Sequence, residues 1–305
     1  MRFFSEEAHA RTMRNGPDVP GQRPSFPLSL DEVGIANKTV WVRLPQGRIP
    51  FAARLTVQLE GGRRGIHMSR MEDAISTLGE DHFPTVSGYA LALVDLLQRG
   101  QQCATACVVL EGKLPVESRT LISGRISSDM IELACRASTG IERPGCRIAL
   151  RVGVWHMTVC PCTQIYAQTA LAVSAPPWPL PSHSQRSRTA LEVEGDELAI
   201  EPEQLHRILR HSLHACQDLL KRPDEAELVL KAHLHPQFAE DAVREAARAV
   251  AGRLAHLPAA TVVRIESRSL ESIHLHDVVC GFSSTLGQLR MLAESEVGRG
   301  PAAGG

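Results

Sequence analysis

The residues best suited to chemistry are two cysteines separated by one proline, in the stretch VCPCTQ at 159–164. Thiolates are soft ligands for zinc or iron, and a catalytic metal site typically takes three protein ligands and leaves one position for water. In an extended chain Cys160 and Cys162 can share a face, whereas Pro161 can turn the chain and give the two sulfurs different roles. Two loop cysteines without function explain the stretch equally well, so this motif alone does not establish a site.

Three further polar stretches provide groups that could complete such a site. They are PSHSQRS at 181–187 with His183, KRPDE at 221–225 with Glu225, and LESIHLHD at 270–277 with Glu271, His274 and His276. Each has an ordinary explanation as well: a surface histidine, a solvated charge cluster, and the polar side of an edge strand. Together they offer thiolate, imidazole and carboxylate without the Cys-x-x-Cys spacing of a structural zinc site, which favours an open, catalytic metal site.

The composition is that of a soluble globular protein with a sizeable core. Of the 305 residues 43% are hydrophobic and 22% charged, and 33 Lys and Arg against 34 Asp and Glu give a net charge of −1. This balance gives no reason to expect nucleic acid or a membrane as a partner, so any anion must be bound by local cations. The N-terminus has no apolar run of signal-peptide length, and we expect the protein in the cytoplasm.

Residues 152–185 contain no Asp, Glu, Lys or Arg, but their prolines and histidines argue against a membrane helix. We expect strand, loop and turn there, with Cys160 and Cys162 flanked by loop. The other six cysteines lie among apolar neighbours, and we expect them to be small buried residues rather than parts of a disulfide framework.

The hydrophobic periodicity predicts a mixture of strands and helices. Strands are expected at 38–45, 51–60, 103–114, 146–160, 189–195, 226–234, 260–267 and 273–282, and helices at 69–80, 86–100, 201–222 and 236–257. This order favours an α+β fold with helices on one face of a sheet. The sequence has no glycine-rich phosphate loop, so nothing supports a Rossmann or P-loop assignment.

The ends of the chain differ from its body in composition. Residues 1–27 and 296–305 are rich in Pro, Gly and charge, and we expect both segments to be disordered. A proline cluster begins at residue 176 and suggests a division of the body into two modules, 28–175 and 176–295.

Six motifs, in order along the chain, resemble those of type I-B GTP cyclohydrolase. They are GIHMSR at 65–70, CPCT at 160–163, SHSQRS at 182–187, KRPDE at 221–225, FAEDAVR at 238–244 and LESIH at 270–274. The resemblance implies the tunnelling fold, with two tandem modules of antiparallel sheet and paired helices on one face, assembled as a homotetramer with sites at subunit interfaces. It also implies the conversion of GTP to 7,8-dihydroneopterin triphosphate and formate, the first step of tetrahydrofolate biosynthesis.

The resemblance assigns roles to individual residues. Cys160, His183 and Glu225 match the ligands of a divalent metal, which could be zinc, manganese or iron. Cys162, Glu271 and His274 match groups that move protons or position the substrate while a metal-bound water attacks C8 of guanine and formate is lost. Expected substrate-binding residues are Glu240 for guanine and Arg70, Arg186, Lys221, Arg222 and His67 for the triphosphate.

Glu240 has a physical reason for its assignment. A carboxylate can accept two parallel N–H bonds from N1 and the exocyclic amine of guanine, a pairing that adenine does not offer. A surface glutamate in the first turn of a helix is also favourable on dipole grounds alone.

Two departures from the family pattern concern the segment that follows Cys162. Thr163 and Gln164 stand where the family has Ser-Lys, and residues 166–181 form a longer and more proline-rich segment.

Two other functions are alternatives to GTP cyclohydrolase. One is a related tunnelling-fold enzyme acting on a pterin or deazapurine, such as one that forms a cyclic phosphate or a nitrile reductase, and the other is a non-catalytic metal-binding homologue. Guanine specificity separates the last of these from an enzyme, because a metal store would not distinguish GTP from ATP.

Overall fold

The structure is a computed structural model that describes residues 3–140, 145–173, 177–196, 198–218 and 220–297. The strands in these residues are β1 (Leu30–Leu44), β2 (Gly47–Leu59), β3 (Ala106–Arg119), β4 (Ile126–Thr139), β5 (Cys146–Val159), β6 (Ser184–Asp196), β7 (His214–Ala215), β8 (Val262–Ser269) and β9 (Val278–Thr285). The helices are α1 (Glu6–Asn15), α2 (Met68–Thr77), α3 (Val86–Gln101), α4 (Pro161–Ala170), α5 (Pro202–Ser212), α6 (Arg222–Leu234), α7 (Ala239–Arg253) and α8 (Leu286–Val297).

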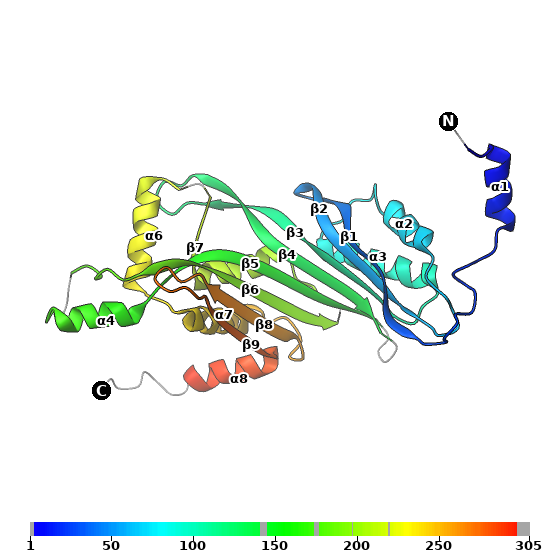
Figure 1. Cartoon of the computed structure of the whole chain (residues 1–305). Coiled ribbons are helices and arrows are strands. Elements are labelled where there is room, and N and C mark those ends of the chain that lie inside the picture. Colours follow the sequence, from blue (N-terminus) through cyan, green and yellow to red (C-terminus); the bar gives the residue numbers. More distant parts are fainter. Residues whose placement is uncertain (1–2, 141–144, 174–176, 197, 219, 298–305) are drawn as a thin grey trace.

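The strands form one antiparallel sheet in the order β1-β2-β3-β4-β5-β6-β8-β9, with the short β7 beside β5 (Figure 1). The sheet consists of two similar halves. In each half two strands are followed by helices and then by two more strands, and β4 pairs with β5 to join the halves. This repeat makes β5 the first strand of the second half, whereas the predicted module boundary after residue 175 leaves it in the first.

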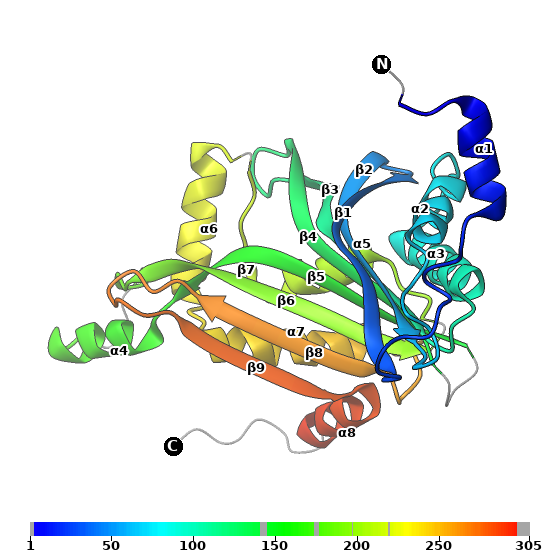
Figure 2. The same cartoon turned by 45° about the vertical axis from the view of Figure 1, so that its right-hand side comes forward.

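Both halves bury the same face of the sheet. Leu110, Cys135, Leu150, Val193 and Val263 are paired directly across β3, β4, β5, β6 and β8, and all five are fully buried. The pair α2 and α3 covers this face in the first half, and the pair α5 and α7 covers it in the second (Figure 2). The predicted α+β fold with paired helices on one face of an antiparallel sheet is therefore confirmed.

The opposite face carries ion pairs that cross several strands. Glu194 of β6 accepts hydrogen bonds from Arg147 of β5 at 2.6 Å and from Arg264 of β8 at 2.5 Å, and Arg136 of β4 lies 3.1 Å away. Burial raises the pKa of this carboxyl, but the hydrogen bonds and charges of the arginines outweigh it and hold the pKa below its usual range. One carboxylate thus links four strands across both halves.

Replacing Glu194 with Gln is expected to lower the free energy of unfolding by about 2 kcal/mol, because the charge-assisted hydrogen bonds from the arginines are lost. The folded-state pKa is below the unfolded one, so this stabilisation is present above about pH 4.3 and is lost as the pH falls through the folded-state pKa. Urea unfolding of both proteins at about pH 7 and about pH 3 measures the difference, which should shrink at the acidic pH.

The matched control is Glu266→Gln. Glu266 pairs with Arg151 at 2.6 Å, but its side chain is 61% exposed, compared with 8% for Glu194. An exposed pair of this kind contributes about 0–1 kcal/mol. Equal losses of stability in the two variants would contradict the special role given to Glu194.

Two segments of the second half differ from the prediction. The strand expected at 226–234 is wrong, because these residues belong to helix α6. Pro223 stands at the start of this helix, and the Asp224 carboxylate accepts hydrogen bonds from Ile122 N at 2.9 Å and Ser123 Oγ at 2.6 Å, so the helix is fixed by its first turn. The helix expected at 201–222 ends at Ser212, because the following residues pair with β5 as β7.

Three other segments also differ. The loop expected after Cys160 is helix α4, since Pro161 is tolerated in the first turn, where its missing N–H costs nothing. Strand β4, which the periodicity does not predict, fills the position between β3 and β5. The last predicted strand, 273–282, begins only at Val278, and residues 272–276 form bends between β8 and β9.

The termini carry one helix each among the described residues. Helix α1 lies within the segment 1–27 that was expected to be disordered; Ser5 caps it by accepting a hydrogen bond from Ala8 N at 3.1 Å, and none of its side chains is buried. Helix α8 continues to Val297, and the rest of the predicted disordered tail lies outside the described residues. No helix in the described residues combines the length and the apolar character that crossing a membrane requires.

Candidate active site

The junction of β5 and α4 positions the two cysteines. Cys160 is the N-cap residue of α4, and Cys162 lies in the first turn of that helix. The Cys162 side chain is exposed, whereas Cys160 is partly buried and accepts a hydrogen bond from Thr163 Oγ1 at 3.6 Å. Positions two apart on a helix do not face each other, so the two thiols do not share a face. Of the two arrangements that the sequence left open, Pro161 produces the one that separates the sulfurs.

Cys160 and His183 are neighbours across two strand ends. The β5–β6 ladder closes with Val159 opposite Ser184, and one residue further the Cys160 N–H donates to the His183 carbonyl at 3.2 Å. The Ser182 hydroxyl also donates to the Cys160 carbonyl at 2.6 Å. The sheet register therefore brings together two of the three predicted metal ligands.

A polar cluster surrounds His183. Its Nδ1 lies 3.1 Å from Gln185 Oε1 and 3.9 Å from Glu271 Oε2, and the side chains of His183 and Glu271 are only 13% and 8% exposed. Oε1 of Glu271 accepts hydrogen bonds from Ser269 Oγ at 2.8 Å and Gln185 Nε2 at 3.2 Å. Glu271 is thus held beside an imidazole, with its second oxygen turned towards that ring.

The connection between β8 and β9 adds two more imidazoles. The His274 ring meets the His183 ring edge-on at 6.3 Å and stacks on His276 at 5.1 Å. The sequence predicted His274 and His276 on one face of a strand. In the structure both lie in bends, and the loop between β8 and β9 brings their rings close to His183. The cluster joins two predicted catalytic residues, Glu271 and His274, to one predicted metal ligand.

Buried hydroxyls, which no sequence motif indicates, support this cluster. Thr158 Oγ1 lies 2.8 Å from Ser187 Oγ and 3.2 Å from Ser269 Oγ, on the face of the sheet that the helices cover. In the next row His156 Nε2 lies 2.8 Å from Thr189 Oγ1, and burial lowers the pKa of His156 to about 4. The sequence does contain a sign of this polar region, because the core-facing positions of β5 are apolar up to Val154 and polar beyond it.

Glu225 lies apart from Cys160 and His183. Helix α6 touches the site with its last turn, where Gln164 Nε2 donates to the His233 carbonyl at 3.0 Å. Glu225 is exposed in the first turn of that helix, eight residues earlier, which is about 12 Å along the axis. In the part of the chain that the structure describes, no three His, Cys, Asp or Glu side chains converge on a metal position. The predicted triad is therefore not assembled within one chain, although its donor types suit zinc, manganese or iron.

Glu240 lies near the same end of β5. It is exposed in the first turn of α7, and the segment just before this helix contacts the strand, because Val159 N donates to the Gln237 carbonyl at 3.3 Å. Burial first, and then the charge of Glu240, raise the pKa of Cys280 on β9. Glu240 has no hydrogen bond among the described residues, so its carboxylate is available to a ligand.

The predicted phosphate-binding cations are spread over the chain. Lys221 and Arg222 begin α6, and Arg186 of β6 stacks on Trp155 with its guanidinium 4.7 Å from the ring. His67 and Arg70 lie at the start of α2, where Arg70 donates to the Gly100 carbonyl at 3.0 Å. Helices α2 and α4 are at opposite ends of the sheet (Figure 1). Within one chain, His67 and Arg70 therefore do not join the cluster around Cys160.

The overall fold has a counterpart among solved structures. Uricase from Bacillus fastidious superimposes with a TM-score of 0.53 over 90% of this chain and 98% of its own, at 8% sequence identity. A likeness at this identity concerns the fold alone. The fold is the α+β tunnelling fold, as predicted.

Sequence comparisons identify the family within that fold. A family model described as type I GTP cyclohydrolase folE2 matches residues 17–280. GTP cyclohydrolase MptA of Aeropyrum pernix is 32% identical over 92% of this chain and 100% of its own length, and GTP cyclohydrolase MptA of Methanothermobacter thermautotrophicus is 30% identical over 93% and 98%. The chain belongs to the type I GTP cyclohydrolase folE2 family and is a GTP cyclohydrolase, a hydrolase that acts on GTP.

Proposed function

We propose that the protein is a type I-B enzyme, which converts GTP to 7,8-dihydroneopterin triphosphate and formate and so begins tetrahydrofolate biosynthesis. The observation that carries this proposal is the cluster of His183, Glu271 and His274 beside Cys160, in a chain of the GTP cyclohydrolase family. The second candidate, which the sequence resemblance also allows, is a related GTP cyclohydrolase that forms a cyclic phosphate product.

Product analysis separates the two candidates. Purified protein is incubated with GTP and with zinc, manganese or iron, and formate, pyrophosphate and the oxidised, fluorescent pterin are separated and measured. We expect formate and a linear triphosphate, with no pyrophosphate and no reaction of ATP. A cyclic phosphate with released pyrophosphate would replace the proposed product, and metal binding without GTP turnover would contradict both.

We propose Cys160, His183 and Glu225 as the ligands of the divalent metal. The backbones of Cys160 and His183 are hydrogen-bonded to each other. Thiolate, imidazole and carboxylate are the donor types that zinc and iron accept in open catalytic sites. When bound, the metal would act as a Lewis acid towards the water that attacks C8 of guanine. Glu225 is the weakest member of this set because of its place in the first turn of α6.

The chain's own groups would move the protons. Oε1 of Glu271 is already occupied by Ser269 and Gln185, so we assign Oε2 the role of accepting a proton from the attacking water. The His274 ring, beside His183, would deliver a proton to the ring nitrogen that is released when C8 leaves as formate. Cys162, exposed in the first turn of α4, is the third group proposed to move a proton or position the substrate.

Ser269 is expected to act through Glu271. Replacing Ser269 with Ala removes a 2.8 Å hydrogen bond to the carboxylate, and one hydrogen bond to a charged group contributes about 1.5–3 kcal/mol. We expect kcat for GTP to fall roughly tenfold with KM unchanged, because Ser269 is buried and is not one of the proposed substrate-binding residues. Ser269→Thr, which retains a hydroxyl, should restore most of kcat; an equal loss in both variants would point to a packing effect.

We propose that the active enzyme is a homotetramer with its sites at subunit interfaces. The supporting observation is that Arg70 and His67 lie at the other end of the sheet from Cys160. The proposed triphosphate site therefore combines Arg186, Lys221 and Arg222 with Arg70 and His67 of a second copy. Four negative charges of GTP need such local cations in a chain of net charge −1.

Complementation tests this arrangement. Cys160→Ala and Arg70→Gln variants are each expected to be nearly inactive, and co-expression of both should restore GTP turnover, because a mixed oligomer contains some sites without either change. The control is co-expression of the Cys160→Ala and Glu271→Gln variants. This mixture should stay inactive, because both residues belong to the same site of one chain and every site then carries one of the two changes. Restoration in the control only, or in neither mixture, would contradict shared sites.

A further inference from the structure

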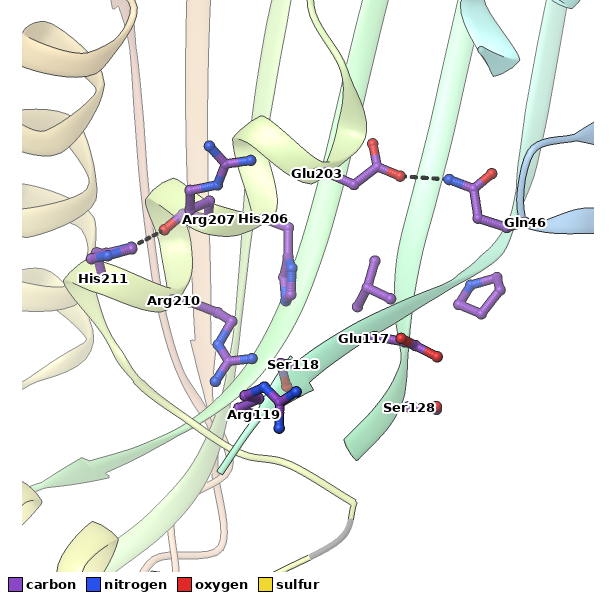
Figure 3. Close-up of a pocket in the computed structure, with 12 residues that line it drawn as sticks. Gln46, Glu117, Ser118, Arg119, Ser128, Glu203, His206, Arg207, Arg210 and His211 are labelled. Carbon is purple, nitrogen blue, oxygen red and sulfur yellow. Dashed lines mark hydrogen bonds between the residues drawn. The ribbon is translucent and has the colours of Figure 1, made fainter. Parts of the chain in front are cut away.

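A cleft of about 810 Å³ lies between α5 and the strands β3 and β4 (Figure 3). Small-molecule sites typically have volumes of about 300–1,000 Å³. Pro115 and Val116 of β3 form an apolar part of its lining, and none of the residues proposed for catalysis, metal binding or GTP binding lines it. The cleft is therefore a space separate from the candidate active site.

Two arginines extend into this cleft from different elements. Arg210 projects from α5 towards Arg119 of β3 (Figure 3). Arg210 has no hydrogen bond or ion pair among the described residues, and Arg119 donates only to the Gly124 carbonyl at 3.0 Å. Each guanidinium has five N–H donors in a planar fork that matches phosphate. Two such groups facing each other repel, and an anion bound between them would remove this repulsion.

His206 adds a neutral hydrogen-bonding group next to the arginines. It lies one turn before Arg210 on α5, and its ring points into the cleft (Figure 3). Burial first, and then the charge of Arg210, lower the pKa of His206 to about 4, although Asp129 acts in the opposite direction. The ring is therefore uncharged near neutral pH, with one N–H to donate and one nitrogen to accept. Among the described residues His206 has no hydrogen-bond partner.

Arg207 and His211 of α5 also line the cleft, and the remainder of the lining is acidic or neutral. Gln46 Nε2 donates to the Glu203 carboxylate at 2.7 Å, which joins the β1–β2 turn to α5 at one end of the cleft. The Glu117 carboxylate and the Ser128 hydroxyl lie on the strand side, away from Arg210 (Figure 3). Glu117 has no ion pair among the described residues. A ligand that fits both ends carries negative charge at one end and N–H donors at the other.

We propose that this cleft is a second ligand site, outside the catalytic centre, which binds a small phosphate ester whose ring system carries N–H donors. Arg119 and Arg210 bind the phosphate, His206 donates a hydrogen bond to it or to the adjoining sugar, and Glu117 accepts from the ring. Purine nucleotides and pterin phosphates share this chemistry. No bond is made or broken at the site.

Calorimetric titration with ATP tests the site, because ATP lacks the guanine pattern expected at Glu240. We expect ATP to bind the full-length enzyme, and Arg210→Gln to weaken that binding by about tenfold through the loss of charge-assisted hydrogen bonds. Arg207→Gln is the matched control: Arg207 stands on the same helix and also lines the cleft, but its side chain extends away from Arg119 (Figure 3). GTP turnover at saturating GTP should be unchanged in both variants.

The other outcomes decide against the proposal. Absence of ATP binding, or equal affinity of ATP for the wild type and Arg210→Gln, would overturn it. An equal loss in Arg207→Gln would mean that only the general positive charge of α5 is involved, which also overturns it. Titration with pyrophosphate and with adenosine tests the two halves of the ligand: we expect both to bind more weakly than ATP, and pyrophosphate binding as tight as that of ATP would contradict the role of Glu117.

Discussion

Cys160→Ala is expected to lose its metal and to reduce GTP turnover by at least about a hundredfold, since even residues that merely support metal ligands change affinity or activity by about 10–100-fold. The thiol lies at the N-cap of α4, next to His183, and no other side chain of the described cluster can replace a soft ligand. Metal content by elemental analysis and formate release from GTP are measured on the same sample.

Cys162→Ala is the matched control for this experiment. Cys162 is exposed one helical position beyond Pro161, and we expect its removal to reduce turnover while the metal content stays that of the wild type. Loss of metal in Cys162→Ala, with retention in Cys160→Ala, would reverse the two assignments. Glu225→Gln and Glu271→Gln complete the set. If only Glu271→Gln loses the metal, the carboxylate ligand is Glu271, in the loop after β8, and not Glu225 of α6.

Glu240→Gln is expected to reduce kcat/KM for GTP by roughly a hundredfold or more, because two hydrogen bonds from guanine to a carboxylate, each contributing about 1.5–3 kcal/mol, become one acceptor and one opposed donor. Glu240 is exposed in the first turn of α7 and lacks a partner among the described residues, so the protein itself should keep its stability. Steady-state kinetics with GTP and with inosine triphosphate, which lacks the exocyclic amine, measure the effect.

Asp241→Asn serves as the control for Glu240. The Asp241 carboxylate caps α7 by accepting a hydrogen bond from Phe238 N at 3.0 Å. Its replacement should lower stability by about 1 kcal/mol and leave the preference for GTP over inosine triphosphate unchanged. If Glu240→Gln keeps the preference for GTP, guanine is recognised by another group.

The fold could be predicted from the sequence where one face of a strand or helix is continuously apolar. The alternation around Leu110, Leu150, Val193 and Val263 indicates strands, and these residues do form the buried row across the sheet. Strand β4 is absent from the prediction although a signal was present, because its buried residues Ile131, Leu133, Cys135 and Ala137 alternate with more exposed ones. Helix α6 was mistaken for a strand because Leu228, Val229 and Leu230 have no helical periodicity, while its start depends on a contact between Asp224 and Ser123 about 100 residues away.

The candidate site could be predicted in its residue types but not in its geometry. The motifs single out Cys160, His183 and Glu271, yet the adjacency of the first two depends on the β5–β6 register, which becomes visible only when the strands are paired. Ser269 and Thr158 belong to no motif that indicates chemistry, and their role as supports follows from burial beneath the helices. The separation of Glu225 from Cys160 and His183 could not be predicted, because the segment that follows it was assigned as a strand and is in fact helix α6.

The ladder between β4 and β5 has a consequence for the order in which the chain acquires its shape. The first half, up to Thr139, already contains four strands and two covering helices when it leaves the ribosome, but β4 is then an outermost strand with unpaired N–H and C=O groups. Synthesis proceeds at about 5–20 residues per second. Strand β5 follows β4 directly in the chain, so it can cover this edge within seconds, and β5 is then the open edge until β6 has been made. During synthesis the most recently made strand is therefore the one that is exposed to pairing with another chain, and each following strand removes that exposure from its predecessor.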